Sequence, residues 1–66
     1  MNPNKKGQKV RFRSPLDDNE LHQIYEIIEI FLDVEKPRTI IRAVNSGMTF
    51  PPTTIVLVED LEICNN

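Results

Sequence analysis

Residues 16–34 decide the fold of this chain, and they read LDDNELHQIYEIIEIFLDV. When they are placed on a helix at about 100° per residue, four polar residues fall on one narrow stripe: His22, Glu26, Glu29 and Asp33. Apolar residues occupy the remaining arc, which is about 220° wide, whereas about 100° is enough to pack a helix on one core. The spacing therefore predicts an amphipathic helix over about 16–34 with a wide apolar face.

The flanking residues supply a start and a stop for this helix. Ser14 can cap the N-terminus, and Pro15 suits the first helical position because its fixed φ is already helical. Pro37 disfavours the α conformation in the residue before it and offers no backbone N–H. The helix is therefore predicted to end near Val34.

The rest of the chain has the patterns of strands. Residues 8–13 alternate between apolar and basic side chains, which is typical of a half-buried strand. Residues 38–44 and 53–58 are rich in β-branched residues, and residues 61–63 give a short last strand. The expected fold class is α+β, with the helix packed on a small, mostly antiparallel sheet of three to four strands. In the alternative arrangement the strands curl into a small barrel and the helix is an insertion after the first strand.

Length and cysteine content point to one domain in a reducing compartment. A chain of 66 residues has room for a single core, so we expect one domain over 1–66, with 1–6 as a flexible N-terminal tail. Its one cysteine, Cys64, cannot form an internal disulfide, which favours the cytoplasm. The polar start leads into no apolar signal segment, and the longest apolar run is too short to cross a bilayer, so no membrane contact is expected.

The charge is distributed unevenly along the chain. The first thirteen residues carry +5, and the remainder carries −7, because ten acids face three basic residues there. The basic residues of the first segment are Lys5, Lys6, Lys9, Arg11 and Arg13. They favour an edge strand that Lys and Arg protect from edge-to-edge pairing, and the alternative is nucleic-acid binding through backbone phosphates without sequence readout.

The residues that chemistry requires are scarce. The chain has one histidine, one cysteine and no glycine-rich loop that could cradle a phosphate. We therefore predict no enzymatic activity, no catalytic residue, no metal site and no cofactor.

The wide apolar arc of the predicted helix favours binding to another protein. A chain this small has one small sheet to lay against the helix, so either loops fold over both flanks of the helix or part of the arc meets a second chain. We favour the second chain, which is a different protein or a second copy in a homodimer formed through the helix face. A proline-stiffened loop after residue 47 offers two further apolar side chains. The predicted anchors are Tyr25, Ile30, Leu32, Met48 and Phe50.

Two segments at the ends of the chain carry a family resemblance. KGQKVRF at 6–12, with FPP at 50–52 and VEDLE at 58–62, resembles the ends of very small SH3-like barrel proteins of bacteria and their phages. The resemblance covers about a third of the chain. It implies a non-enzymatic regulator that binds and modulates a host protein in a bacterial or phage-infected cell, and it supplies no functional residues of its own.

Overall fold

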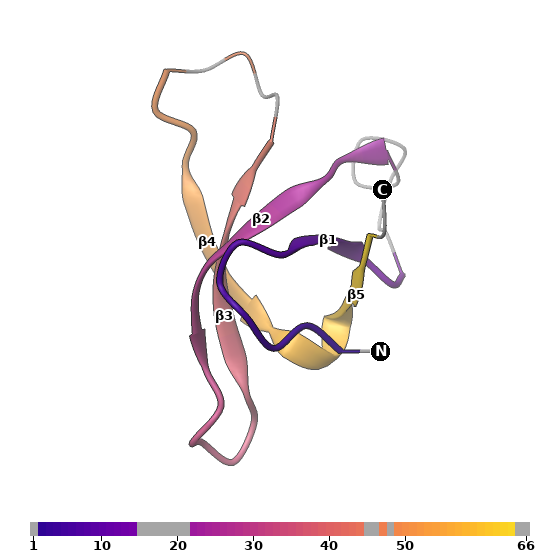
Figure 1. Cartoon of the computed structure of the whole chain (residues 1–66), viewed down its shortest axis with the longest axis vertical. Helices are drawn as coiled ribbons and strands as arrows, with labels where there is room; N and C mark the ends of the chain where they lie inside the picture. The colour runs from indigo at the N-terminus through magenta and orange to yellow at the C-terminus, as the bar shows by residue number, and fades with distance from the viewer. Residues whose placement is uncertain (1, 15–21, 45–46, 48, 65–66) are drawn as a thin grey trace.

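The computed structural model describes residues 2–14, 22–44, 47 and 49–64, and these residues form an antiparallel sheet of five strands (Figure 1). The strands are β1 (Lys9–Phe12), β2 (Tyr25–Phe31), β3 (Arg38–Ala43), β4 (Thr53–Leu57) and β5 (Leu61–Ile63). One turn of 3-10 helix, η1 (Val58–Asp60), connects β4 to β5. The strand order is β4-β3-β2-β1-β5, so the first strand pairs with the last.

Strand β2 joins the two halves of the sheet. Its first residues pair with β1, and its whole length pairs with β3. In Figure 1, β2, β3 and β4 form one tall layer, and β1 and β5 lie to one side of it. Five of its seven residues are β-branched or aromatic, and such side chains pack well on a pleated surface.

A small core lies on one face of this curled sheet. Its buried residues are Val10, Ile27, Ile41 and Leu61, each no more than 1% exposed, and Val58 of η1 is also buried. The half-buried Phe12, Tyr25, Ile30 and Val56 pack against them. Thr39 is the buried polar residue among those described, and its hydroxyl donates a 2.7 Å hydrogen bond to the carbonyl of Glu29. That bond satisfies a group that burial would otherwise destabilise.

Two irregularities bend the sheet. The register between β2 and β3 shifts between Ile27 and Glu29, which leaves Ile28 as the extra residue of a β-bulge. A second bulge precedes β1, where Gly7 donates to the carbonyl of Ile27 and Ile27 donates to the carbonyl of Gln8. Gly7 has φ of 87°, which is the left-handed conformation that this type of bulge requires and that glycine adopts without strain.

The predicted fold class was wrong, and so was the helix over about 16–34. Residues 25–31 form β2, and the described residues make an antiparallel all-β fold in place of an α+β one. Residues 15–21, the first part of the predicted helix, lie outside the described residues. The homodimer predicted through the apolar face of this helix is therefore wrong as well, because residues 25–31 form a strand. The sheet has five strands in place of the expected three to four, because β2 adds a strand to the four segments predicted as strands.

The strand predictions were accurate to within a residue or two. Strands predicted at 8–13, 38–44, 53–58 and 61–63 are confirmed as β1, β3, β4 and β5. The interpretation of the basic strand as a sheet edge was wrong, because β1 lies between β2 and β5. The predicted flexibility of residues 1–6 stays a prediction. Pro3 is fully buried, and the N–H groups of Asn4 and Lys5 donate to the side-chain oxygen of Gln8.

Candidate protein-binding surface

The outer face of β2, β3 and β4, opposite the core, carries apolar side chains. Along β3, Thr39 and Ile41 point into the core while Arg38, Ile40 and Arg42 point outward. The register places Ile55 beside Ile40, and Ile55 is 63% exposed. Phe31 lies beside Arg38 and is 45% exposed. An isolated exposed apolar residue needs no explanation, but a group of them on one sheet face is typical of a binding surface.

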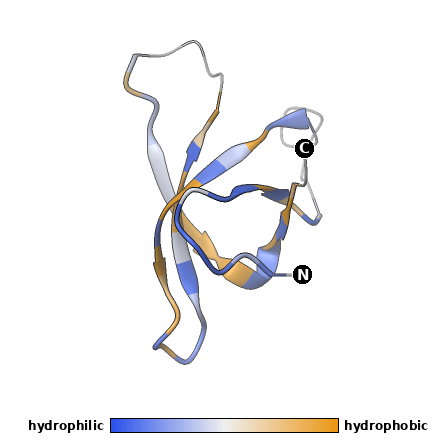
Figure 2. Ribbon diagram, viewed as in Figure 1, coloured by the Kyte–Doolittle hydropathy of each residue, from blue (hydrophilic) through white to orange (hydrophobic). Residues whose placement is uncertain are grey.

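The bulge at Ile28 is what turns Phe31 outward. Side chains alternate between the two faces of a strand, so Ile27, Glu29 and Phe31 would share the core face of a regular strand. The extra residue reverses the alternation, so Ile30 packs against the core and Phe31 faces out. Figure 2 shows the hydrophobic end of β2 running into a hydrophilic turn before β3.

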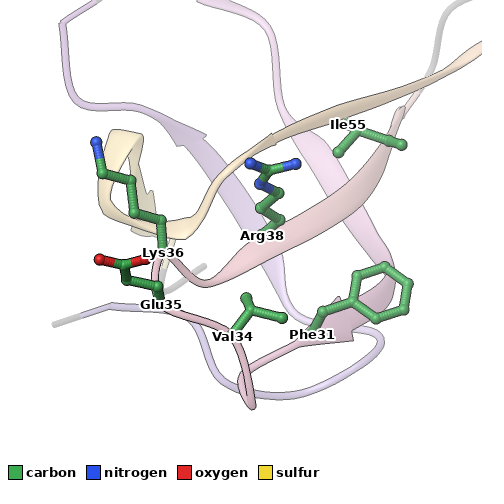
Figure 3. A pocket seen from close by; sticks show the side chains of 6 residues that line it. All are labelled: Phe31, Val34, Glu35, Lys36, Arg38 and Ile55. Carbon is green, nitrogen blue, oxygen red and sulfur yellow. The ribbon is translucent and has the colours of Figure 1, made fainter.

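These side chains line an open groove of about 640 Å³, which we call the outer groove. Its lining residues are Phe31, Val34, Glu35, Lys36, Arg38 and Ile55. Figure 3 shows the apolar side chains of Phe31, Val34 and Ile55 toward one end, Glu35 and Lys36 at the other, and Arg38 between them. Val34 is 49% exposed. An apolar floor beside a few charged groups is the composition of a site that takes an apolar side chain and fixes its orientation by polar contacts.

The other end of the same sheet face is polar. Lys6 forms an ion pair with Glu29 at 3.4 Å, and Arg42 forms one with Glu26 at 3.3 Å. Arg11 on β1 contacts Glu62 on β5 at 2.6 Å. Lys6, Arg11 and Arg42 are each paired with an acid, so this end of the face is charged, in contrast to the apolar groove.

The Arg11–Glu62 pair shifts both of its titrating groups. The hydrogen bond from Arg11 lowers the pKa of the Glu62 carboxyl; desolvation opposes this lowering in part, and the positive charge of Arg11 adds to it. The same hydrogen bond raises the pKa of Arg11. The pair joins β5 to β1 at the surface, beside the backbone pairing of the two strands.

The predicted protein-binding residues do not come together. Tyr25 and Ile30 pack against the core, and the Tyr25 ring makes an edge-to-face contact with Phe12 at 5.4 Å between centroids. Leu32 is 48% exposed in the β2–β3 turn, and Phe50 is 89% exposed in the β3–β4 loop. These two lie beyond opposite ends of β3 (Figure 1). Met48 lies outside the described residues.

Three of the five predicted nucleic-acid-binding residues are held by protein groups. Lys6 and Arg11 form the ion pairs described above. Arg13 donates hydrogen bonds to the carbonyl of Glu59 and to the side chain of Asn2. Lys5 and Lys9 are exposed and form no side-chain ion pair with any residue that the structure describes.

Sequence reasoning missed the residues that line the outer groove. The sequence pattern placed Phe31 and Val34 on the apolar arc of a helix. It placed Ile55 in a strand but did not predict which face of the sheet Ile55 occupies. The available signal was the composition of 53–57, TTIVL, which contains no charge to mark an outward face. Such a strand is either buried on both faces or exposed at an edge, and composition alone does not separate the two.

Comparison of the chain with protein-family models, with curated proteins and with solved structures found no match. Across residues 2–14, 22–44, 47 and 49–64, no three His, Cys, Asp or Glu side chains lie close enough together to hold a metal ion. The described segments contain no helix with the length and hydrophobicity that a bilayer crossing would require.

Proposed function

We propose that this chain is a non-enzymatic protein-binding module that takes an apolar side chain of another protein into the outer groove. The observation that carries the proposal is the outward grouping of Phe31, Val34 and Ile55 on the face opposite the core. Phe31 and Val34 are about half exposed and Ile55 is 63% exposed, so burying them against a partner would remove apolar area from solvent.

The charges beside the groove suit a partner with mixed polarity. Glu35 and Lys36 lie at one end of the groove and Arg38 lies in its middle, so both signs of charge are present within reach of a bound segment. Interfaces of this kind derive most of their affinity from a few buried apolar anchors, and the polar rim sets orientation and specificity. Phe31 is the residue that we expect to contribute most.

The role that we propose in the cell is that of a small bacterial or phage-encoded regulator of a host protein. The resemblance to very small SH3-like barrel proteins is part of this proposal. It is supported by the pairing of β1 with β5, because the two resembling segments, 6–12 and 58–62, lie side by side in the sheet. Pairing of the first and last strands is what a small barrel needs to approach closure.

Selection from a displayed library of random peptides tests the proposal. We expect peptides with an apolar anchor to be enriched on the immobilised protein, and we expect Val34→Glu to abolish their binding by placing a charge in the groove. Leu32→Glu is the matched control, because Leu32 has nearly the same exposure as Val34 and does not line the groove. Equal loss in both variants, or no enrichment on the wild type, would contradict the proposal.

Nucleic-acid binding through Lys5, Lys6, Lys9, Arg11 and Arg13 is the second candidate. The observation in its favour is the exposure of Lys5 and Lys9, whose side chains pair with no acid among the described residues. A titration with duplex DNA and single-stranded RNA at low and moderate salt tests it. Phosphate binding requires affinity that falls steeply with salt, and Lys9→Gln should then lower the salt slope by about one.

A further inference from the structure

Strand β4 forms one edge of the sheet, and its outward backbone groups have no partner within the described part of the chain. The N–H of Val58 donates to the carbonyl of Pro37, which fixes the phase of the β3–β4 ladder. In that phase Val56 and Thr54 exchange hydrogen bonds with β3. The N–H and C=O groups of Thr53, Ile55 and Leu57 consequently point away from the sheet.

This edge lacks the features that normally prevent strand addition. Natural edge strands are short, charged, interrupted by proline or bulged. Within its five residues, TTIVL, β4 has no charge and no proline, and its register with β3 is unbroken. Such a strand is an open template for another extended chain.

We propose that the occupant of this edge is a second copy of the same chain, with the two β4 strands antiparallel and a two-fold axis at Ile55. The two Ile55 residues then face each other, and Thr53 of each copy faces Leu57 of the other. Every outward N–H and C=O of one β4 gains a partner on the other, because the three outward residues are placed symmetrically about Ile55. The result is one continuous sheet that crosses both copies.

The side chains on the outer face match in this register. Ile40 lies beside Ile55 within one copy, so the axis creates an unbroken apolar row of Ile40 and Ile55 from each chain. Cross-strand pairs of β-branched residues stabilise a sheet. Ile55, exposed at 63% in the single chain, would be covered by its counterpart.

The charges do not oppose this arrangement. No charged residue lies on β4, and Glu59, the first acid after it, lies in η1, beyond the last residue of the strand. A homodimer brings identical charges near its axis unless that region is neutral, and here it is neutral.

The second copy also adds a wall to the outer groove. This point rests on the proposed function, whereas the dimer itself does not. Leu57 lies beside Arg38, and Thr53 of the second copy would lie beside Leu57. The side of the groove that is open at β4 thus gains a wall. Strand addition over five residues gives an interface at the small end of the range, so the dimer should form and dissociate with concentration.

Sedimentation equilibrium of the full chain over a concentration series tests the proposal. We expect a monomer–dimer equilibrium whose dissociation constant rises about tenfold or more in Ile55→Pro. That substitution removes an outward N–H and leaves the hydrogen bonds to β3 intact, and proline is tolerated on an edge strand in that orientation. Val34→Glu is the matched control, because it blocks the groove away from the edge and should leave the dimer unchanged. A monomer at every concentration would overturn the dimer without touching the groove, which Val34→Glu reports separately.

Disulfide mapping in a Cys64→Ser background fixes the register even if the proline variant fails to fold. Ile55→Cys should cross-link to itself under mild oxidation, since directly opposed residues have Cα atoms about 5.5 Å apart. Thr53→Cys alone should not cross-link, whereas a mixture of Thr53→Cys with Leu57→Cys should. Cross-linking of Thr53→Cys to itself, or peptide binding that Ile55→Pro abolishes in a strict monomer, would overturn the assignment to a second copy.

Discussion

The two edge strands of the sheet differ in how they are protected. β5 has three residues, and its central Glu62 is tied to Arg11 of the neighbouring strand. β4 has five residues, none of them charged, and presents the exposed Ile55. Short length and charge are common devices against unwanted strand pairing, and the chain applies both at β5 and neither at β4. The proposal that a second copy pairs with β4 rests on this difference between the two edges.

The largest contrast that we expect is between two single-residue deletions in β2, the central strand that both edges depend on. Deleting Ile28 removes the bulge and leaves a regular alternation of core and outer residues, so the sheet should still form with a changed bend. Deleting Ile30 instead moves Phe31 toward the core face and removes a core side chain, so the domain should unfold. Circular dichroism with thermal melting compares the two, and a melting temperature for the Ile30 deletion equal to or above that of the Ile28 deletion would contradict the role of the bulge.

The same bulge explains why the sequence predicted a helix. Glu26 and Glu29 both face outward from β2, and a regular strand would place two such residues an even number apart. The extra Ile28 makes the spacing three, which is the spacing of one helix face. The composition of β2, rich in isoleucine with tyrosine and phenylalanine, is typical of a strand, whereas the spacing of its acids is that of a helix.

The remaining elements could be predicted because their patterns are uninterrupted. Lys9–Phe12 alternates strictly, and the β-branched runs of β3 and β4 are bounded by turn residues and prolines. Strand order could not be obtained in the same way, because pairing between β1 and β5 depends on contacts about fifty residues apart that leave no local pattern. The outer groove was missed for the same reason. Which side chains share a sheet face, and which strand lies at an edge, can be stated only when the strand order is known.

The next contrast is between two isoleucines one strand apart, Ile41 on β3 and Ile55 on β4. Ile41 is 1% exposed, and its replacement by alanine should lower the free energy of unfolding by about 2–5 kcal/mol. A domain of this size has roughly 3–10 kcal/mol in total, so that variant should be largely unfolded at moderate temperature. Ile55→Ala should change stability by about 0.5 kcal/mol or less when the chain is monomeric. Urea denaturation of dilute protein measures both free energies of unfolding. A large loss of stability in Ile55→Ala would mean that the Ile55 side chain contributes to the fold and is not free to bind a partner.

A smaller effect should follow from exchanging the protection of the two edges. Ile55→Lys places like charges opposite each other at the proposed axis, so we expect self-association to weaken about tenfold. Glu62→Thr removes the charge that guards β5, so association should strengthen or stay as it is. Light scattering over a concentration series compares them. If Ile55→Lys associates as strongly as the wild type, the open edge is not the contact.

The smallest effect concerns the pH dependence of the guarded edge. The folded-state pKa of Glu62 is below its ordinary value of 4.5, because Arg11 hydrogen-bonds to the carboxylate. A depressed carboxyl pKa contributes stability that is fully present above the unfolded-state pKa and is lost as the pH falls through the folded-state value. The wild type should therefore lose its advantage over Glu62→Gln as the pH drops below 4.5, and a carbon-detected NMR titration should give Glu62 a pKa below 4.5. A Glu62 that titrates at or above 4.5 would mean that the Arg11 contact does not persist in solution, and β5 would then be guarded by its short length alone.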